Sequence, residues 1–298
     1  ELDALLAEIC EGKKTSKSDA ARFATGVSVV PTFSKDNTDR NRTSPFAFTG
    51  NKFEFRAVGS SQSVAGPNTI LNAILADAME KMADEIESGK SFEDVVKEFV
   101  LAHKRIIFNG DGYSAEWEEE AAKRGLPNNK NTVDALKCLK EEKNLEMLDR
   151  LGVYSRVELG SRYEILLENY IKTIQVEGLT ALKMAKSQIY PAVCDYLSKV
   201  SSEVIAAKEA GLDVDFLVDD ANALAKLVKT MKEQMTTLET NIAAAQASEE
   251  EIFEQAVAWR DDVFAMMQAL RETVDQLEES IDAEYWPMPT YLDLLFGI

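Results

Sequence analysis

The regular pattern that decides the fold runs from residue 217 to residue 245 and reads LVDDANALAKLVKTMKEQMTTLETNIAAA. Its apolar side chains recur at alternating steps of four and three, which is the spacing of a helix with one buried face. A second segment, from Ile252 to Leu270, repeats this spacing. We therefore expect an antiparallel helical hairpin at about 213–284, with the segment Ser248-Glu249-Glu250-Glu251 capping the returning helix. The positions expected to be buried on the first arm are Leu217, Ala221, Leu224, Val228, Met231, Met235, Leu238, Ile242 and Ala245.

Further helices are expected ahead of this hairpin. Ser155-Arg156-Val157-Glu158 has the form of a capping box and should start a long helix, which Pro191 should kink or end. Another helix should begin at Ser91, whose hydroxyl can accept a hydrogen bond from the first turn. Glycines that follow the helical patterns, at residues 125 and 152, are expected to end helices.

The segment after Gly66-Pro67 also has an apolar stripe at helical spacing. A stripe of this kind is more often the core-facing side of a helix than a binding surface. We therefore expect it to be buried. Its members are Ile70, Leu71, Ile74, Leu75, Ala78, Met79 and Met82.

The stretch with the most chemistry runs from Arg40 to Arg56 and reads RNRTSPFAFTGNKFEFR. Its last five residues alternate charged and aromatic side chains. A strand points successive side chains to opposite faces, so residues 52, 54 and 56 should share one face and the two phenylalanines the other. Such a face could neutralise anionic groups, with Glu54 free to hold a divalent metal. An ordinary strand with a solvated face and ion pairs would show the same pattern.

The same stretch resembles the C-terminal catalytic segment of glutamine synthetase, and most closely that of the large type III enzymes. That family has an Arg-Asn-Arg segment, then a basic-x-Glu-x-Arg strand, then an Ala-rich helix, which here are residues 40–42, residues 52–56 and the segment after Pro67. Residues 161–170 resemble the helical C-terminal region of type III. The resemblance implies an α+β, mainly α chain: a C-terminal remnant of the catalytic β-sheet or barrel with its helices at 1–113, then a helical C-terminal domain at 114–298 that contains the hairpin.

The resemblance also implies a reaction and roles for particular residues. Glutamine synthetases join ammonia to glutamate with ATP through a γ-glutamyl phosphate. By position in the family motif, Glu54 is expected to bind Mg²⁺ or Mn²⁺ and Arg56 to bind the glutamate substrate. Lys52 and, more weakly, Arg40 are expected to contact the nucleotide. Arg42 matches the catalytic arginine that steadies the transferred phosphoryl group.

This chain departs from the family pattern in one respect and lacks part of the family's site. Type I enzymes have a further arginine five residues after the one matched by Arg42, where this chain has Ala47. The remaining metal-binding carboxylates and the histidine of the family are expected upstream of Glu1. The chain is therefore interpreted as a fragment that is inactive alone, taken from an enzyme that forms a ring-shaped homo-oligomer. The alternative is an acidic helical scaffold without catalysis, which has no need of the cations between Arg40 and Arg56.

Composition narrows the choice of partners. Lys and Arg number 33 against 52 for Asp and Glu, a formal net charge of −19, so nucleic acid is not an expected partner. No apolar run approaches the ~20 residues that span a bilayer, and no leader pattern appears at the start, which indicates a cytoplasmic protein. The 3 cysteines are widely separated and are expected to be buried free thiols.

Overall fold

The computed structural model describes residues 2–12, 22–23, 33–34, 46–48, 52–56, 59, 62–289 and 291–297. These residues are mainly helical, as predicted, and include short antiparallel strand pairs. The chain divides into two compact units, residues 1–130 with 145–155 and residues 131–144 with 156–298. We call them the first and the second unit and describe each by itself.

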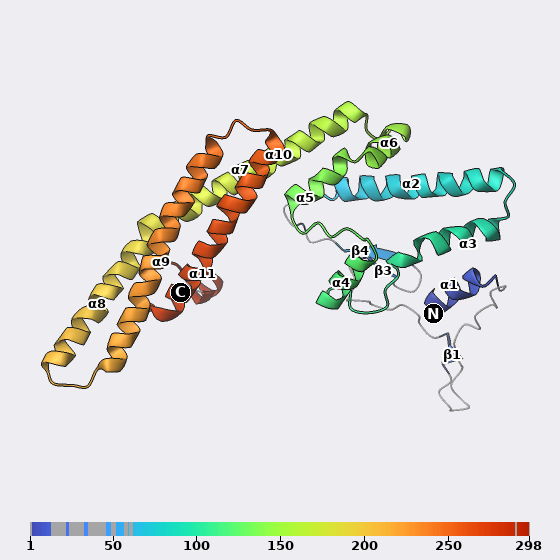
Figure 1. The fold of residues 1–298 in the computed structure, drawn as a ribbon. Coiled ribbons are helices and arrows are strands. Elements are labelled where there is room, and N and C mark those ends of the chain that lie inside the picture. The colour runs from blue at the N-terminus through green and yellow to red at the C-terminus, as the bar shows by residue number, and fades with distance from the viewer. Residues whose placement is uncertain are drawn as a thin grey trace. The chain divides into compact units, whose positions relative to one another are not determined.

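The first unit combines helices with two short strand pairs (Figure 1). Strand β1 pairs antiparallel with β2, and β3 pairs antiparallel with β4. The segment Val27–Val30, closed by Pro31, has a sequence typical of a short strand and lies outside the described residues. The elements are α1 (Leu2–Cys10), β1 (Arg22–Phe23), β2 (Phe33–Ser34), β3 (Phe46–Phe48), β4 (Phe53–Phe55), α2 (Ala65–Glu87), α3 (Phe92–His103), η1 (Lys104–Ile106) and α4 (Ala115–Lys123).

The helix ends of the first unit follow the predicted signals. The Ser91 side chain accepts a hydrogen bond from the Asp94 N–H at 3.1 Å and caps α3. Gly125 and Gly152 have φ of 69° and 64°, values that glycine adopts without strain after a helix. Both predicted helix stops are confirmed.

The apolar stripe on α2 is not buried, and the expectation of a core face there is wrong for this chain. Ile74, Leu75 and Met79 are between 50% and 61% exposed, whereas Ala73 is the buried residue of the helix. Helix α2 packs against α3, and Arg150 at the end of α6 (Glu142–Arg150) forms ion pairs with Asp77 and Glu80. Among the described residues, these contacts leave Ile74, Leu75 and Met79 exposed, whereas the other stripe residues, Ile70, Leu71, Ala78 and Met82, are half-buried.

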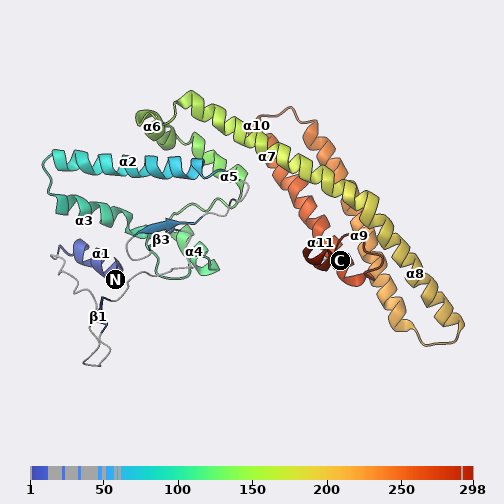
Figure 2. The same cartoon turned by 180° about the vertical axis from the view of Figure 1, so that it is seen from behind.

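The second unit is a set of long helices (Figure 2). Helix α6 runs from one unit into the other, and η3 and η4 are turns of π-helix. The elements are α5 (Thr132–Leu136), η2 (Lys137–Lys140), α6 (Glu142–Arg150), α7 (Arg156–Met184), η3 (Ala185–Ile189), α8 (Tyr190–Glu209), α9 (Asp215–Gln246), α10 (Ile252–Ala258), η4 (Trp259–Phe264), α11 (Ala265–Ser280) and α12 (Tyr291–Phe296).

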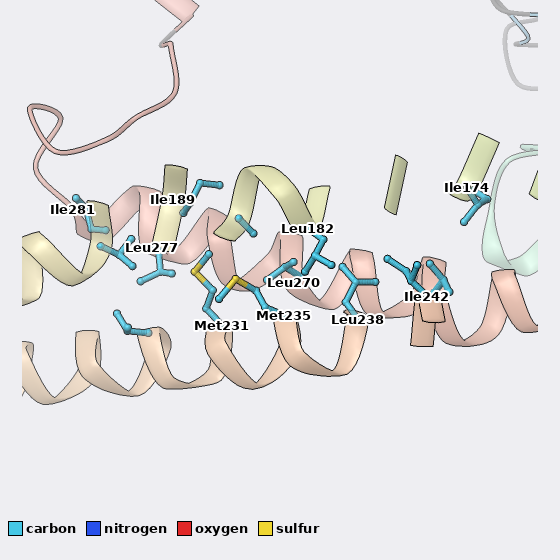
Figure 3. Packing of buried hydrophobic residues seen from close by; sticks show 14 of the residues in the cluster. Ile174, Leu182, Ile189, Met231, Met235, Leu238, Ile242, Leu270, Leu277 and Ile281 are labelled. Carbon is cyan, nitrogen blue, oxygen red and sulfur yellow. The ribbon is translucent and has the colours of Figure 1, made fainter. Parts of the chain in front are cut away.

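The core of the second unit lies between α9 and the helices on either side of it. Helix α9 packs against α8 and α11, and Figure 3 shows Met231, Met235 and Leu238 among the buried side chains of this core. Seven of the positions predicted on the first arm are buried, and Leu217 and Ala221 are half-buried. The seven are Leu224, Val228, Met231, Met235, Leu238, Ile242 and Ala245.

Pro191 does not end the helix that begins at Arg156. The chain passes from α7 through the π turn η3 into α8, where Pro191 lies in the first turn. Proline lacks the N–H that an α-helix interior needs, and its ring collides with the carbonyl four residues earlier. The wider π turn just before it changes that hydrogen-bond pattern, so the helical run continues.

The returning arm begins later than the predicted cap. Helix α10 starts at Ile252 with Glu251 in the N-cap position, and the cap has no side-chain hydrogen bond. The Ser248 hydroxyl instead accepts a long bond, 3.4 Å, from the N–H of Glu250 within the turn. Ser248 therefore shapes the turn and does not cap the helix.

Within the described residues, no helix is long and apolar enough to cross a membrane. Cys10, Cys138 and Cys194 are thiols, as predicted, but each is half-buried and not buried as expected.

Candidate functional site

The candidate site lies on the hairpin formed by β3 and β4. The register pairs Phe46 with Phe55, Ala47 with Glu54 and Phe48 with Phe53. Residues that face each other across an antiparallel pair share a face of the sheet. Ala47 is therefore the cross-strand neighbour of Glu54, and it is 1% exposed.

One face of this hairpin is aromatic. The Phe46 ring stacks on Phe53 with the ring centres 5.5 Å apart and meets Phe55 edge-on at 6.2 Å. All three rings are about half exposed. The predicted alternation, with both phenylalanines of β4 on one side, is confirmed.

The opposite face is charged. The Lys52 Nζ lies 3.4 Å from the Glu54 Oε1, and the Arg56 Nη2 lies 3.1 Å from the Glu54 Oε2. Each carboxylate oxygen of Glu54 thus has a cation as neighbour. The side chains of these residues are 63%, 39% and 31% exposed in the order Lys52, Glu54, Arg56. The structure therefore brings the three predicted residues together on one accessible face.

The electrostatics keep Glu54 charged. The hydrogen bond from Arg56, aided by the hydrogen bond and positive charge of Lys52, lowers the pKa of the Glu54 carboxyl below its ordinary value, although partial desolvation opposes the shift. A metal ligand must be deprotonated, so this state suits metal binding. The pairs themselves contribute little stability, since they are accessible to water.

The carboxylate of Glu54 is suited to be one ligand of a divalent ion. Mg²⁺ prefers oxygen ligands, keeps several waters and takes only one or two protein carboxylates together with substrate phosphates. Among the described residues, however, no group of three or more His, Cys, Asp or Glu side chains could hold a metal ion. Glu54 can therefore supply one ligand but not a complete site.

Two of the predicted site residues cannot be placed. Arg40 and Arg42 lie outside the described residues, so their roles remain predictions. The strand β3 was not predicted, although its sequence carried a signal. The segment Phe46-Ala47-Phe48 repeats the aromatic alternation of β4, and the Gly50-Asn51 that follows is a common turn sequence.

The second unit also has a surface hollow that is lined by acidic side chains. A hollow of about 300 Å³ is lined by glutamates of α7 and of the turn before α10, together with Ile252. One of them, Glu168, forms an ion pair with Lys172 at 2.9 Å. The others are Glu164, Glu249, Glu250 and Glu251. Since no group of metal-binding geometry exists among the described residues, we assign this hollow no function.

Comparison with known proteins gives a consistent result. Residues 91–208 match the model of the glutamine synthetase C-terminal domain, a match that begins ahead of the boundary expected at 113/114. Over 98% of its length the chain is 38% identical to a glutamine synthetase from Butyrivibrio fibrisolvens, of which it covers 43%. It is 33% identical to a type-3 glutamine synthetase from Dictyostelium discoideum and 32% identical to a glutamine synthetase from Bacteroides fragilis, covering 42% of each. The chain thus spans about two fifths of the length of these relatives.

Proposed function

Because this chain belongs to the glutamine synthetase family, we propose that it supplies one wall of the active site of a longer enzyme that joins ammonia to glutamate. The observation that carries the proposal is the group Lys52, Glu54 and Arg56 on a single accessible strand face. A carboxylate between two cations can take part in binding both a divalent metal and anionic substrates.

Glu54 is the metal ligand of this proposal. Bound Mg²⁺ or Mn²⁺ would neutralise the charge that gathers on the phosphates during phosphoryl transfer. The part of Glu54 is to present a charged carboxylate from a paired strand, whose backbone hydrogen bonds hold its position. Other carboxylates and a histidine, from the part of the relatives that this chain does not span, complete the metal site.

Arg56 binds the glutamate substrate. Its guanidinium offers a planar pair of N–H donors that matches a carboxylate, and it lies on the same face as the metal ligand. Lys52 and Arg40 contact the phosphates of ATP, Lys52 as a point charge without the fork of an arginine. Arg42 steadies the phosphoryl group that is transferred.

The chemistry has two steps. A γ-carboxylate oxygen of glutamate attacks the terminal phosphorus of ATP, which breaks the bond to ADP and forms an acyl phosphate. Ammonia then attacks the acyl carbon, inorganic phosphate leaves, and the nitrogen loses a proton to give the amide. In both steps the cations of this strand face offset negative charge on the reacting phosphate, and this stabilises the transition state.

The proposal also assigns the two parts of the chain to domains of the longer enzyme. Residues 1–113 belong to the catalytic domain, and residues 114–298 form a helical domain with a hairpin at about 213–284. The enzyme assembles into a homo-oligomeric ring in the cytoplasm. A purely structural role as an acidic helical scaffold is the alternative that the following experiment must exclude.

The test is ATP-dependent glutamine formation by the longer polypeptide that carries this chain, with and without Glu54→Ala. We expect this change to lower turnover by roughly 10²–10³, as removal of a group that stabilises transition-state charge does elsewhere. Glu142→Ala is the matched control, because Glu142 is an exposed carboxylate paired with Arg156 in the second unit. The chain of residues 1–298 alone should form no glutamine. Near-normal turnover of the Glu54→Ala enzyme would exclude the proposed role.

A further inference from the structure

From the two ion pairs of Glu54, we infer that this carboxylate holds Arg56 and Lys52 in place until a divalent cation binds it, so that cation binding promotes glutamate binding. The inference rests on the proposed function, because it takes Glu54 as metal ligand and Arg56 as glutamate ligand. It adds an order to these events that the roles alone do not contain. Glu54 is then a positioning residue for the substrate site as well as a metal ligand.

The first step concerns the carboxylate. Lys52 approaches one oxygen of Glu54 and Arg56 donates a hydrogen bond to the other, at 3.4 and 3.1 Å. A Mg²⁺ ion binds a carboxylate oxygen at about 2.0–2.1 Å, well inside these distances. It therefore competes with the cation that neighbours the oxygen it binds, Lys52 at Oε1 or Arg56 at Oε2.

The second step concerns the cations. A divalent ion on Glu54 brings like charge close to the ammonium of Lys52 and the guanidinium of Arg56. Repulsion between like charges favours their displacement, and both side chains can move because they are 63% and 31% exposed. Arg56 then regains the Nη2–H donor that Glu54 had occupied. A bidentate grip on a substrate carboxylate uses two N–H donors of the guanidinium, and the freed Nη2–H can be one of them.

The third step concerns the surroundings of Glu54. Its cross-strand neighbour is Ala47, a methyl group that is 1% exposed and contributes no charge. A cation at position 47 would keep Glu54 paired whatever happened to Arg56. With alanine there, position 47 adds no charge beside the Glu54 carboxylate.

The expected effect of Mg²⁺ on glutamate binding is small because the two ion pairs of Glu54 are exposed to water. Ion pairs that water reaches are weak, and each changes an equilibrium by only a few-fold. We expect Mg²⁺ to strengthen glutamate binding by roughly two- to fivefold through this route. By linkage, glutamate must strengthen Mg²⁺ binding by the same factor.

The test measures glutamate binding by titration calorimetry without ATP, in the longer polypeptide that carries this chain, in Mg²⁺ and in EDTA. The unmodified protein should bind glutamate two- to fivefold more tightly in Mg²⁺, a range set by the weakness of exposed pairs. Glu54→Gln keeps the shape of the side chain but not its charge, so it should release Arg56 without metal. This variant should bind glutamate in EDTA as tightly as the unmodified protein does in Mg²⁺. Matching melting curves would show that both proteins are folded alike.

The outcomes separate the inference from the proposed function. Equal glutamate binding in Mg²⁺ and EDTA by an unmodified protein that forms glutamine overturns the inference alone. A Glu54→Gln variant that keeps the full Mg²⁺ dependence also overturns it, since other ligands would then cause the coupling. An unmodified protein that neither binds glutamate nor forms glutamine overturns both.

Discussion

Gly178 of α7 faces Val263 of η4 so closely that a β-carbon at residue 178 would lie 3.2 Å from the Val263 Cγ1. The same β-carbon would lie 3.4 Å from the Ile242 Cδ1 of α9. Three helical segments therefore meet at one glycine, and Val263 and Ile242 are both buried there. The absence of a side chain at residue 178 allows the backbone of α7 to come this close.

We predict that Gly178→Ala lowers the free energy of unfolding by about 1 kcal/mol. Crowding in a packed core costs ~1–3 kcal/mol, and the better helix propensity of alanine returns up to ~1 kcal/mol. Gly160→Ala in the same helix is the control, because a β-carbon there meets nothing within 4 Å. That change should raise stability by up to ~1 kcal/mol. Urea unfolding followed by circular dichroism measures both, and stabilisation by Gly178→Ala would contradict the close contact.

We predict that Leu238→Ala destabilises the chain by about 3 kcal/mol. Leu238 is fully buried between α9 and its neighbours, so the shorter side chain loses contacts and leaves a cavity. Leu179→Ala, at a leucine of α7 that is 44% exposed, should cost less than about 1 kcal/mol. Melting temperatures of both variants measure the difference. Equal decreases for Leu238→Ala and Leu179→Ala would contradict the burial of Leu238.

A pH dependence is expected from Asp134 at the start of α5. Hydrogen bonds from the Lys137 ammonium and the Asn131 side chain, together with the charge of Arg260, lower the pKa of Asp134 to about 2 from an ordinary 3.8. A lowered pKa means that the folded state favours the charged form, so the stabilisation is present above pH 3.8 and is lost as the pH falls toward 2. The difference in melting temperature between the unmodified chain and Asp134→Asn should shrink across this window. Asp219→Asn, on the exposed face of α9, is the control variant. A melting-temperature difference between the unmodified chain and Asp134→Asn that stays constant as the pH falls from 3.8 to 2 would contradict the prediction.

The role proposed for Arg56 predicts a selective change in kinetics. In the longer polypeptide, Arg56→Ala should raise the KM for glutamate roughly tenfold or more, since a hydrogen bond to a charged group contributes ~1.5–3 kcal/mol. The KM for ATP should change little. Arg56→Lys keeps the charge without the planar fork, so its KM for glutamate should lie between those of the unmodified enzyme and of Arg56→Ala. A rise in the KM for ATP alone would assign Arg56 to the nucleotide instead.

The helical part of the chain was more predictable than its packing. The four-three spacing around Met231 and Leu238 identified the buried face of α9, because the period of a helix determines which residues share a side. The same reasoning on Leu75 and Met79 of α2 identified a real stripe but wrongly made it core. Periodicity shows that an apolar face exists and does not show what covers it. Among the described residues, the first unit leaves Leu75 and Met79 of that face exposed.

The candidate site was likewise predictable in part. The alternation of charge and aromatic side chains was enough to place Lys52, Glu54 and Arg56 on one face, because strand geometry depends on neighbouring residues alone. The pairing of Glu54 with Ala47 depends on the register of β3 against β4. A shift of one residue would turn every side chain of β4 to the other face.

The sequence by itself determined the helical character of the chain, the buried face of α9 and the charged face of the strand segment at 52–56. These properties come from interactions among residues a few positions apart, which the order of amino acids specifies directly. Only the tertiary structure decided that the helix continues past Pro191 through a π turn, that Gly178 meets Val263, and that Glu54 lies opposite Ala47. The contact of Gly178 with Val263 forms only when helices distant in sequence dock, and the pairing of Glu54 with Ala47 only when β3 and β4 come together. The π turn before Pro191 departs from α-helical hydrogen bonding, which apolar spacing does not reveal.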